Sequence, residues 1–507
     1  MRLPLLLLAI AGSRAEDVAV TFDPLLPLVR APLSPEYVSV NIDSSSLLKG
    51  FDFKDPVLTN LVARLAPVLL RIGGTASNGI EWSDEGVLPC GSGRGVTVVS
   101  AACFDTVLDF LNATGARLLF DFGGARATGS AAWNTSSADS LMKHVAARGA
   151  GALIGGWQIG NEDPGLAPGA QLGADFLTLK RLAVAHGLPD TLIGPSAGGT
   201  PAAWMAAFCN ATFGELAMWS AHTYGGVDCK DATGASFISR RTYYGFVDQL
   251  HGYVHTKNTS LANSTGLLVE ETASAAIGGC VNASDRFIDG FYWLTVMGMP
   301  AEYGVTQINR QDVAGWSFLG LESHYTLAGP PGWTNGSALL VPHADWYTTV
   351  LFKQIMGSRV LNFSWSNSAY PAPDTGSNVT IHAFCSATTA GGVSLAYVVG
   401  MGEDVTLTVP SLATLVPRDE YVLTATATAF AARRAGGGVA DAPAPAELWD
   451  DAIFLNGERL TVDSAGRLPA YPIPGRRVTD AAAEIVLPAF SYGFIHFPAA
   501  GIAACSA

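Results

Sequence analysis

The sequence has few positive charges and few charges of any kind. Lys and Arg number 29 against 43 Asp and Glu among 507 residues, charged residues make up 14% of the chain, and the formal net charge is −14. Because phosphate and sulfate are bound through basic surfaces, this balance argues against nucleic acid and makes a highly sulfated polysaccharide an unfavourable partner. Disorder is excluded, since 49% of the residues are hydrophobic and can form a large core.

Long apolar runs are also missing. Beyond the N-terminus, no segment offers the roughly 20 uninterrupted apolar residues that a membrane-spanning helix needs. The nearest is the tail at 485–507, which contains Pro488, Gly493 and His496. We expect a final strand there, with a lipid-anchor tail as the minor alternative. Stable membrane insertion is therefore not expected.

The first fifteen residues have the organisation of a secretory signal peptide. Arg2 precedes an apolar stretch at 3–12, and Ser13, Arg14 and Ala15 form a small-x-small cleavage site. Cleavage would remove two arginines and no acid, which takes the net charge from −14 to −16. A buried N-terminal strand is the alternative.

Sequons for N-glycosylation follow at Asn112, Asn134, Asn210, Asn258, Asn263, Asn282, Asn335, Asn362 and Asn378. Behind a signal peptide, so many sequons predict a glycoprotein that is secreted or carried to a lysosome-like or vacuole-like compartment.

The seven cysteines include no CxxC pair, which weakens zinc-binding and redox interpretations. They fit disulfide bonds in an oxidising compartment, and an odd number leaves at least one thiol unpaired within the chain. Connectivity cannot be deduced from spacing. We expect Cys90–Cys103 and Cys385–Cys505, with Cys280 unpaired.

Eight short apolar segments alternate with helix-like stretches in the first two thirds of the chain. They lie at 38–43, 68–73, 117–122, 154–160, 192–197, 218–224, 267–271 and 302–307. Their spacing of roughly 25 to 45 residues leaves room for one crossover helix each, and eight such units predict a (β/α)8 barrel. Helical stripes at 57–65 and 174–185 would pack on its exterior. An open doubly wound sheet is the competing fold, but no GxGxxG follows the first strand.

Beyond about Gly357 the alternation gives way to short strands separated by turn residues. These segments lie at 379–384, 393–399, 405–409, 421–427, 453–455 and 484–497. We therefore expect an α/β fold, a (β/α)8 TIM barrel with a C-terminal antiparallel β-sandwich domain. The expected divisions are a signal peptide at 1–15, an N-terminal strand joining the sandwich at 16–36, the catalytic barrel at 37–356 and the sandwich at 357–507.

Two predicted barrel strands end in carboxylates, at the edge where barrel enzymes hold their active sites. The fourth ends in Asn161 and Glu162, and the seventh in Glu270 and Glu271. Retaining glycoside hydrolysis needs one carboxyl that protonates the leaving oxygen and one carboxylate that attacks the anomeric carbon, about 5–5.5 Å apart. Repulsion between them would raise the pKa of the acid. Position alone is only suggestive, because any barrel has polar strand ends.

Motifs along the whole mature chain resemble those of the heparanase-like enzymes, glycoside hydrolase family 79. They are WQIGNEDPG at 157–165, LVEETASAAIGG at 268–279, VSVNID at 38–43, LRIGGT at 70–75, QLGADFLTL at 171–179, HTY at 222–224, RQ at 310–311 and LPAFSY at 487–492. The resemblance implies a retaining β-glucuronidase that needs no metal or organic cofactor, with Glu162 as acid/base and Glu271 as nucleophile.

Glu270 is the rival nucleophile. Neighbours on a strand face opposite ways, so only one of the two glutamates should point into the site. The family pattern places its glutamate directly before Thr, which selects Glu271. That pattern has Gly at the preceding position. We interpret Glu270 as a solvated strand-end carboxylate, with a tuning role as the alternative.

The resemblance also implies a substrate-binding set. Sugar hydroxyls would be bound by Asp43, Asn161 and Gln311, the uronate carboxylate by the amides of Gly278 and Gly279, while Tyr224 would orient the nucleophile. His222 would line the pocket, in either a structural or a binding role. An aromatic partner for the carboxylate falls near 316–318 or at Tyr325.

The chain departs from the basic members of this family. Residues 198–202 read GGTPA where the resemblance places a Gln-Pro-Arg-Arg-Lys run, and comparable clusters are missing elsewhere. The linker that is excised from the animal enzyme is here the short segment 82–103, so we expect one uncleaved chain. We predict a secreted, monomeric retaining β-glucuronidase acting on a uronic-acid-containing glycan of low sulfation. The alternatives are a heparanase-type endo-β-glucuronidase on heparan sulfate, a catalytically silent glycan-binding relative and a retaining arabinofuranosidase.

Overall fold

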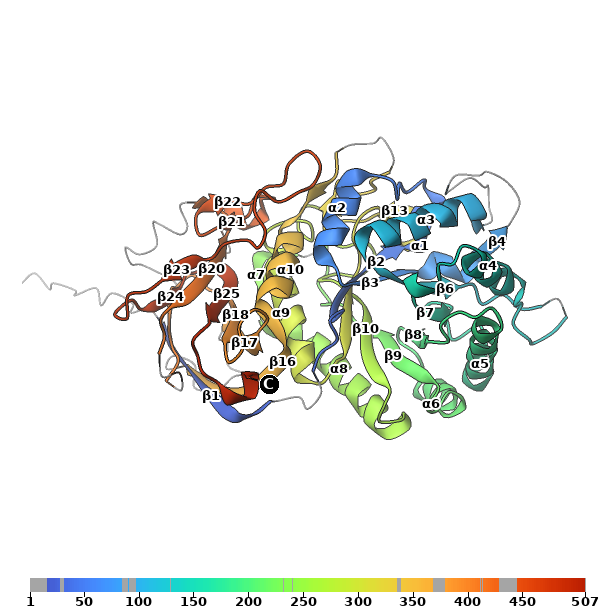
Figure 1. Ribbon diagram of the computed structural model, residues 1–507, viewed down its shortest axis with the longest axis horizontal. Coiled ribbons are helices and arrows are strands. Elements are labelled where there is room, and N and C mark those ends of the chain that lie inside the picture. The colour runs from blue at the N-terminus through green and yellow to red at the C-terminus, as the bar shows by residue number, and fades with distance from the viewer. Residues whose placement is uncertain are drawn as a thin grey trace, which may run out of the picture.

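A computed structural model gives the structure of the chain, and two bodies lie side by side in it (Figure 1). It describes residues 16–27, 32–83, 90, 97–127, 129–230, 232–238, 240–334, 339–367, 379–410, 412, 414–427 and 445–506. The expected signal peptide at 1–15 lies outside these residues, as do the sequons at Asn335 and Asn378. Among the described helices, none is long and apolar enough to cross a membrane.

Eight parallel strands close into a barrel. In chain order they are β2 (Val38–Asp43), β3 (Leu69–Gly73), β6 (Arg117–Phe122), β7 (Ile154–Ile159), β8 (Leu192–Ala197), β9 (Leu216–His222), β10 (Gly266–Thr272) and β11 (Gln307–Arg310). Each strand pairs with the next in the chain, and β11 pairs with β2 to close the ring. The predicted (β/α)8 barrel is therefore confirmed.

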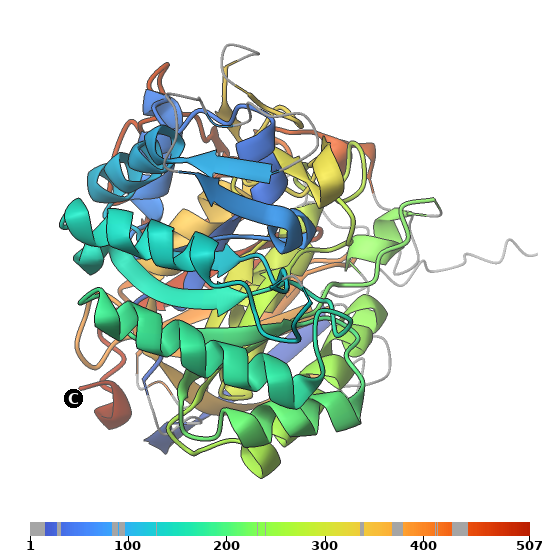
Figure 2. The same cartoon turned by 90° about the vertical axis from the view of Figure 1, so that its right-hand side faces the viewer.

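Helices surround this barrel, as Figure 2 shows for the side that carries α4 and α5. They are α1 (Ser44–Leu48), α2 (Pro56–Leu65), α3 (Ala101–Thr114), α4 (Ser136–Ala147), α5 (Gly169–Ala185), α6 (Ala202–Ala211), α7 (Gly234–Ile238), α8 (Arg240–Ser260), α9 (Asp289–Glu302) and α10 (Ala344–Ile355). In α2, the Asp55 carboxylate accepts from the amides of Val57 and Leu58, and Pro56 occupies the first helical position. The apolar residues of α2 are buried against the barrel, as their spacing predicted.

The eighth strand lies later than expected. We placed it at 302–307, but Glu302 ends helix α9 and β11 begins at Gln307. Helix α9 is buried on nearly all sides, so its sequence has no polar face that would reveal a helical period. Gly304, with φ +79°, provides the left-handed turn between the helix and the strand.

The C-terminal part is built on extended, mainly antiparallel strands. They are β16 (Met356–Asn367), β17 (Val379–Ser386), β18 (Val393–Val399), β19 (Val405–Thr408), β20 (Arg418–Thr424), β21 (Phe454–Leu455), β22 (Glu458–Arg459), β23 (Arg476–Val478), β24 (Ile485–Leu487) and β25 (Ser491–Phe497). β1 (Glu16–Pro27) pairs antiparallel with β16 and parallel with β19, so the N-terminal strand belongs to this sheet. The segment expected as one strand at 484–497 is two, because Phe490 turns the chain at φ +48°.

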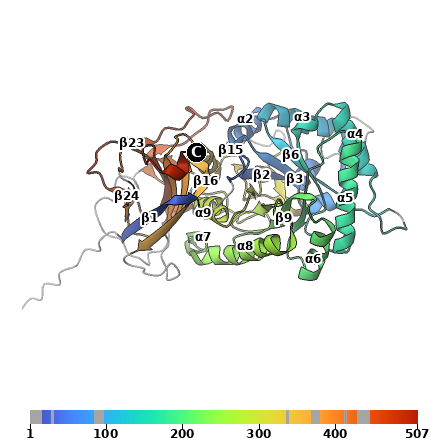
Figure 3. The same cartoon turned by 60° about the horizontal axis from the view of Figure 1, so that its bottom comes forward.

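Alternate residues of these strands face two cores. Ile381, Leu395 and Ile495 belong to a core within the sheet region, whereas Phe384, Ala396 and Phe494 belong to the large core shared with the barrel. Helix α9 lies between barrel and sheet in Figures 1 and 3, and it contacts β17, β18 and β25. The two bodies are thus joined by a continuous apolar interface.

Short strands lie in the loops that extend the barrel. They are β4 (Ile80–Ser83), β5 (Thr97–Ser100), β12 (Trp316–Ser317), β13 (Leu321–Glu322), β14 (Ala328–Gly329) and β15 (Val341–Pro342). Each forms a two-stranded ribbon with its neighbour. The β12–β13 ribbon follows β11 and so lies on the side of the barrel where its strands end.

Three disulfide bonds link Cys90 to Cys103, Cys229 to Cys280 and Cys385 to Cys505. The first and third were expected, but the expectation that Cys280 is unpaired is wrong. Cys280 and Cys229 lie in the loops that follow two adjacent barrel strands, β10 and β9, which sequence spacing does not reveal. The unpaired thiol is Cys209, buried on α6.

Candidate active site

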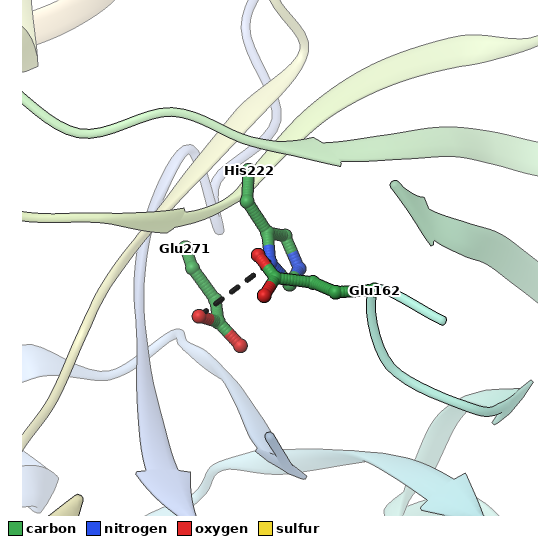
Figure 4. Close-up of side chains that lie close together, drawn as sticks. All are labelled: Glu162, His222 and Glu271. Atoms are coloured by element: carbon green, nitrogen blue, oxygen red, sulfur yellow. Dashed lines mark hydrogen bonds and ion pairs between the residues drawn. The ribbon is translucent and has the colours of Figure 1, made fainter. Parts of the chain in front are cut away.

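Two glutamates face each other where the barrel strands end. Glu271 lies within β10, and Glu162 follows β7, with its amide donating to the Ser196 carbonyl on β8 at 3.0 Å. Figure 4 shows the two carboxylates reaching toward one another from opposite sides, with the His222 ring beside them. One carboxylate oxygen from each, together with a ring nitrogen of His222, lie within 4.8 Å of one another. The structure therefore brings together the two residues that the strand ends predicted.

Arg71 lies at the centre of this site although the sequence analysis gave it no role. It comes from β3 and is fully buried. Its guanidinium donates to Glu271 Oε1 at 2.5 Å, Asn161 Oδ1 at 2.6 Å, Ser196 Oγ at 3.0 Å and Gln158 Oε1 at 3.1 Å. Burial would lower its pKa, but the surrounding carboxylates raise it instead, so the guanidinium stays charged. An arginine inside an otherwise apolar strand was the signal that could have identified it.

Glu271 is held on both oxygens. Arg71 donates to Oε1, and the Tyr224 hydroxyl donates to Oε2 at 2.7 Å. Burial, followed by the Glu271 charge, raises the pKa of Tyr224 well above its usual range, which keeps the hydroxyl a donor. The side chain of Glu271 is only 7% exposed. This carboxylate is therefore fixed in position and kept next to a permanent positive charge.

Glu162 is held by one imidazole. His222 Nδ1 lies 2.5 Å from Glu162 Oε1, and the Glu162 side chain is 37% exposed. Burial would lower the pKa of His222, but Glu271, Glu162 and Glu270 raise it to about 10. Burial would likewise raise the pKa of Glu162, but the His222 charge lowers it. We expected repulsion to raise the pKa of the acid, and the paired imidazolium reverses that direction.

Glu270 is buried, which contradicts its interpretation as a solvated carboxylate. It is 0% exposed, accepts from Gln158 Nε2 at 2.8 Å, and lies 3.2 Å from His222 Nε2 and 3.6 Å from Arg71 Nε. Burial would raise its pKa, but Arg71 and His222 lower it to about 2. The expectation that only one glutamate could point inward is also wrong. The pairing register of β10 shifts after Val269, and this irregularity breaks the strict alternation of faces.

The three residues expected to bind hydroxyls lie around the same opening. Asp43 caps α1 by accepting from the amide and hydroxyl of Ser45, and burial raises its pKa to about 6. Gln311 donates to Asp43 at 3.3 Å and accepts from Asn41 at 2.7 Å. The Asn161 side-chain oxygen accepts from Arg71 at 2.6 Å and from Ser196 Oγ at 3.2 Å.

The glycine pair lies on the other side of Tyr224. Gly278 and Gly279 have φ of +87° and +79°, and a Cβ on Gly278 would lie 2.8 Å from the Glu322 carbonyl oxygen. The Gly279 amide already donates to the Ala276 carbonyl at 3.2 Å, so one of the two amides assigned to a carboxylate serves the turn. Tyr325 packs against Gly279, and its ring stacks on Tyr224 at 6.4 Å between centroids, while Ser317 of the 316–318 segment lies beside Gly278. Both locations expected for the aromatic partner therefore border the glycine pair.

The spacing of Glu162, His222 and Glu271 would also suit three ligands of a metal ion. Glu271, however, pairs with the buried Arg71 guanidinium, and His222 Nδ1 pairs with Glu162. A divalent cation would have to displace both contacts and lie beside a fixed positive charge. The donor set therefore does not fit a metal, and we assign no metal ligands.

Known proteins share sequence with the part of the chain that forms most of the barrel. A family model described as glycosyl hydrolase family 79, N-terminal domain, matches residues 33–298, more than half of the chain. Heparanase from Mus musculus is 27% identical over 428 residues, covering 80% of this chain and 70% of the relative. Hyaluronoglucuronidase from Hirudo nipponia is 22% identical over 537 residues, covering 97% of this chain and 99% of the relative.

Among solved structures, a GH51 arabinofuranosidase from Xanthomonas axonopodis pv. citri superimposes with a TM-score of 0.63. The alignment covers 95% of this chain and 100% of that one at 15% sequence identity. At this identity the likeness concerns the fold alone. It covers both the barrel and the C-terminal sheet, so the two bodies together have a fold that is also found in that structure.

Proposed function

The chain belongs to glycosyl hydrolase family 79, and from this premise we propose that it is a retaining β-glucuronidase that hydrolyses β-linked glucuronic acid by double displacement. One observation carries the proposal. Carboxylate oxygens of Glu162 and Glu271 lie within 4.8 Å of each other. Retaining enzymes place their two carboxyl groups about 5–5.5 Å apart, whereas inverting enzymes leave about 6.5–9.5 Å for a water molecule.

Glu271 is the nucleophile in this mechanism. Its carboxylate attacks the anomeric carbon, the glycosidic bond breaks, and a covalent glycosyl-enzyme forms. Arg71 and Tyr224 hold its two oxygens, so the attacking atom is placed before substrate binds. Arg71 also places a positive charge 2.5 Å from the attacking carboxylate.

Glu162 and His222 together hold the proton that the leaving oxygen needs. The proton crosses the 2.5 Å contact from His222 Nδ1 to Glu162, and Glu162 delivers it to the leaving oxygen. In the second step Glu162 takes a proton from water, whose oxygen attacks the anomeric carbon and releases Glu271. The exposure of Glu162 suits this role, because both the leaving group and water must reach it.

Recognition of the uronate carboxylate falls to the side of the site beyond Tyr224. Ser317 and Tyr325 border the glycine pair there, since a Cβ on Gly278 would lie 3.0 Å from Ser317 Oγ and one on Gly279 would lie 3.0 Å from Tyr325 Cβ. The Ser317 hydroxyl is buried beside Tyr325, and this contact opposes the rise that burial causes in the pKa of Tyr325. Neutral donors at this point favour a single carboxylate over a highly charged sulfated sugar.

On the opposite side, next to Glu162, no Lys or Arg is among the described residues that line the recess. Gly198 packs directly on the acid/base, since a Cβ there would lie 2.5 Å from Glu162 Oε1, and Thr200 lines the recess beside it. The apolar residues that line this recess are Ile159, Pro164, Leu166, Leu172, Pro195, Ala197 and Trp204. We therefore favour a glycan of low sulfation over heparan sulfate.

The proposal extends to a secreted, single-chain, monomeric enzyme. Its supports are the signal-like N-terminus, three disulfide bonds, and a site to which one chain supplies both carboxylates and their partners. The same proposal takes 37–356 as the catalytic barrel, with 16–36 and 357–507 forming the sandwich.

The purified protein tests this function on a panel of aryl glycosides and uronate polymers. We expect cleavage of aryl β-glucuronide, with the β-anomer released first in an NMR time course, and no cleavage of aryl arabinofuranoside. Hyaluronan or another unsulfated uronate polymer should be preferred to heparan sulfate. Preferred fragmentation of heparan sulfate would establish the heparanase alternative, and full activity in Glu271→Gln protein would show that the assigned site is wrong.

A further inference from the structure

Glu270 is a buried carboxylate in direct contact with the site, at a position where the family pattern carries Gly. We propose that Glu270 is a positioning residue that binds the far side of the His222 ring and thereby keeps the catalytic proton on the Glu162–His222 pair to higher pH. This inference rests on the proposed function, since it assigns the proton of that reaction. It goes beyond that function because it concerns a residue that the resemblance leaves without a role.

The geometry around the His222 ring carries the inference. Nδ1 faces Glu162 at 2.5 Å, while Nε2 faces Glu270 Oε2 at 3.2 Å and Ser196 Oγ at 2.9 Å. A neutral imidazole has one N–H and can donate to only one of these carboxylates. The imidazolium can donate to both. Burial of the ring, with 2% of the side chain exposed, prevents water from replacing either partner.

Several other charged and polar groups surround the His222 ring. Glu271 lies 3.5 Å from Nδ1, and Tyr253 on α8 donates to the His222 carbonyl. Arg71 lies beneath, pairing with Glu271 and Asn161, and Asp121 on β6 pairs with Arg71 at 3.5 Å without touching the ring. Arg71 and a protonated His222 thus share the site with three carboxylates. Glu270 and Glu271 each lie near both cations, and Glu270 is the one of the two that faces Nε2 of the ring.

Glu270 is itself held in place. Gln158 Nε2 donates to its Oε1, which leaves Oε2 for His222 and Arg71. Gln158 in turn accepts from Arg71 Nε through its own side-chain oxygen. The arrangement of donors therefore suits an ionised carboxylate and no protonated one.

The consequence concerns the basic side of the pH profile. Cleavage requires one proton within the Glu162–His222 pair, and activity falls when the pair loses it. A negative charge beside the pair stabilises the proton wherever it resides, so Glu270 moves this loss to higher pH. An opposite charge within about 4–6 Å shifts a pKa by roughly 1–3 units, and we expect an effect of that size.

The test compares wild-type and Glu270→Gln protein on two glucuronides. With an alkyl β-glucuronide, whose poor leaving group needs the proton, the basic limb of kcat/KM should move down by about 1–3 pH units. With 4-nitrophenyl β-glucuronide, whose leaving group needs little protonation, the basic limb should move less. Identical limbs for both proteins on the alkyl substrate would overturn the inference.

Two variants separate charge from packing. Glu270→Asp keeps the charge and should keep a basic limb near the wild-type position. Asp121→Asn removes another buried carboxylate that pairs with Arg71 yet does not touch His222, so it should leave that limb in place. A shift in Asp121→Asn equal to that in Glu270→Gln would show that the effect is general to the site and would contradict a specific role for Glu270.

A titration that needs no substrate keeps the inference and the proposed function apart. In wild-type protein with ¹⁵N-labelled histidine, the His222 resonance should stay that of an imidazolium well above pH 6.5, its ordinary pKa. It should become neutral at lower pH in Glu270→Gln protein. A neutral His222 at pH 7 in wild type would overturn the inference even if the variant failed to fold. Failure of wild type to cleave any glucuronide would instead overturn the proposed function.

Discussion

The two sides of the barrel mouth hold their carboxylates in opposite ways. Glu271 is buried, and both of its oxygens are bound, one by a guanidinium and one by a hydroxyl. Glu162 is partly exposed, and among the described residues its side chain is held only by His222. A nucleophile needs fixed position and charge, whereas an acid/base must exchange a proton with two different partners. The contrast in surroundings therefore supports the different roles proposed for two chemically identical side chains.

Arg71 is the residue whose loss should break both sides at once. Arg71→Met would remove the partner of Glu271 and Asn161 and leave buried carboxylates uncompensated, which typically costs about 3–5 kcal/mol of stability. We expect a loss of kcat of at least ~10³-fold, together with a clear fall in Tm. Denaturant unfolding and initial rates on an aryl glucuronide measure both effects.

Arg71→Lys is the matched control. It keeps the charge but loses the planar fork that reaches Glu271, Asn161 and Gln158 together. Relative to Arg71→Met, we expect Arg71→Lys to restore more of the lost Tm than of the lost kcat. If Arg71→Met were as active as wild type, the nucleophile side would not depend on this guanidinium.

Reaction with azide distinguishes the proposed roles of Glu162 and Glu271 most directly. In Glu162→Gln protein, cleavage of a poor leaving group should fall about 10²–10⁴-fold, while 4-nitrophenyl β-glucuronide still forms the covalent intermediate. Azide should then attack that intermediate and give the β-glucuronyl azide. NMR of the product identifies its anomer.

Glu271→Gln protein should behave in the reverse manner. Its covalent step is lost for every leaving group, and an activated α-glucuronyl fluoride is needed before the variant shows any turnover. The same azide product from both variants would mean that the two sides do not differ in role.

Tyr224 tests how far the nucleophile side depends on its second donor. Tyr224→Phe removes the hydrogen bond to Glu271 Oε2, and a bond to a charged group contributes about 1.5–3 kcal/mol. We therefore expect kcat to fall about 10- to 100-fold with little change in KM. Tyr325→Phe, which leaves Glu271 untouched, should instead raise KM for glucuronides, and equal effects of the two variants on KM would contradict this division.

Sequence patterns located much of this site because they report on position along a strand. Apolar segments at regular spacing predicted the barrel, and the strand ends that carry Glu162, Glu270 and Glu271 predicted where the site lies. The family resemblance then selected Glu271 over Glu270 as the nucleophile. The direction in which each side chain points was harder to predict. The register shift in β10 turns Glu270 inward beside Glu271, and no local residue pattern marks such an irregularity.

Arg71 and the protonation of His222 were missed for a different reason. Both depend on charges from several strands that converge only in the closed barrel. A pKa in such a cluster belongs to all the interacting residues together and not to one of them. The eighth strand was misplaced because a helix buried on all sides has no polar period to distinguish it from a strand. Errors of this kind fall where tertiary contacts decide the outcome.

Stability against pH gives the smallest predicted effect and concerns the floor of the site, beneath both carboxylates. Burial raises the pKa of Asp121 to about 7 from an ordinary value of 3.8, with Arg71 opposing the shift. A carboxyl with a raised folded-state pKa costs stability as pH rises from the unfolded value through the folded one. The Tm of wild type should therefore fall between about pH 4 and pH 7 relative to that of Asp121→Asn protein, since one pKa unit corresponds to about 1.4 kcal/mol.

Glu270 should show the opposite sign. Its folded pKa is lowered to about 2 from 4.5, so its contribution is present above pH 4.5 and is lost as pH falls toward 2. A Tm series from pH 3 to 8 on wild type, Asp121→Asn and Glu270→Gln would resolve both slopes. If the Tm values of Asp121→Asn and wild type changed in parallel from pH 4 to 7, Asp121 would be ionised in the folded protein. The carboxylates around Arg71 would then carry one more negative charge than the raised pKa of Asp121 indicates.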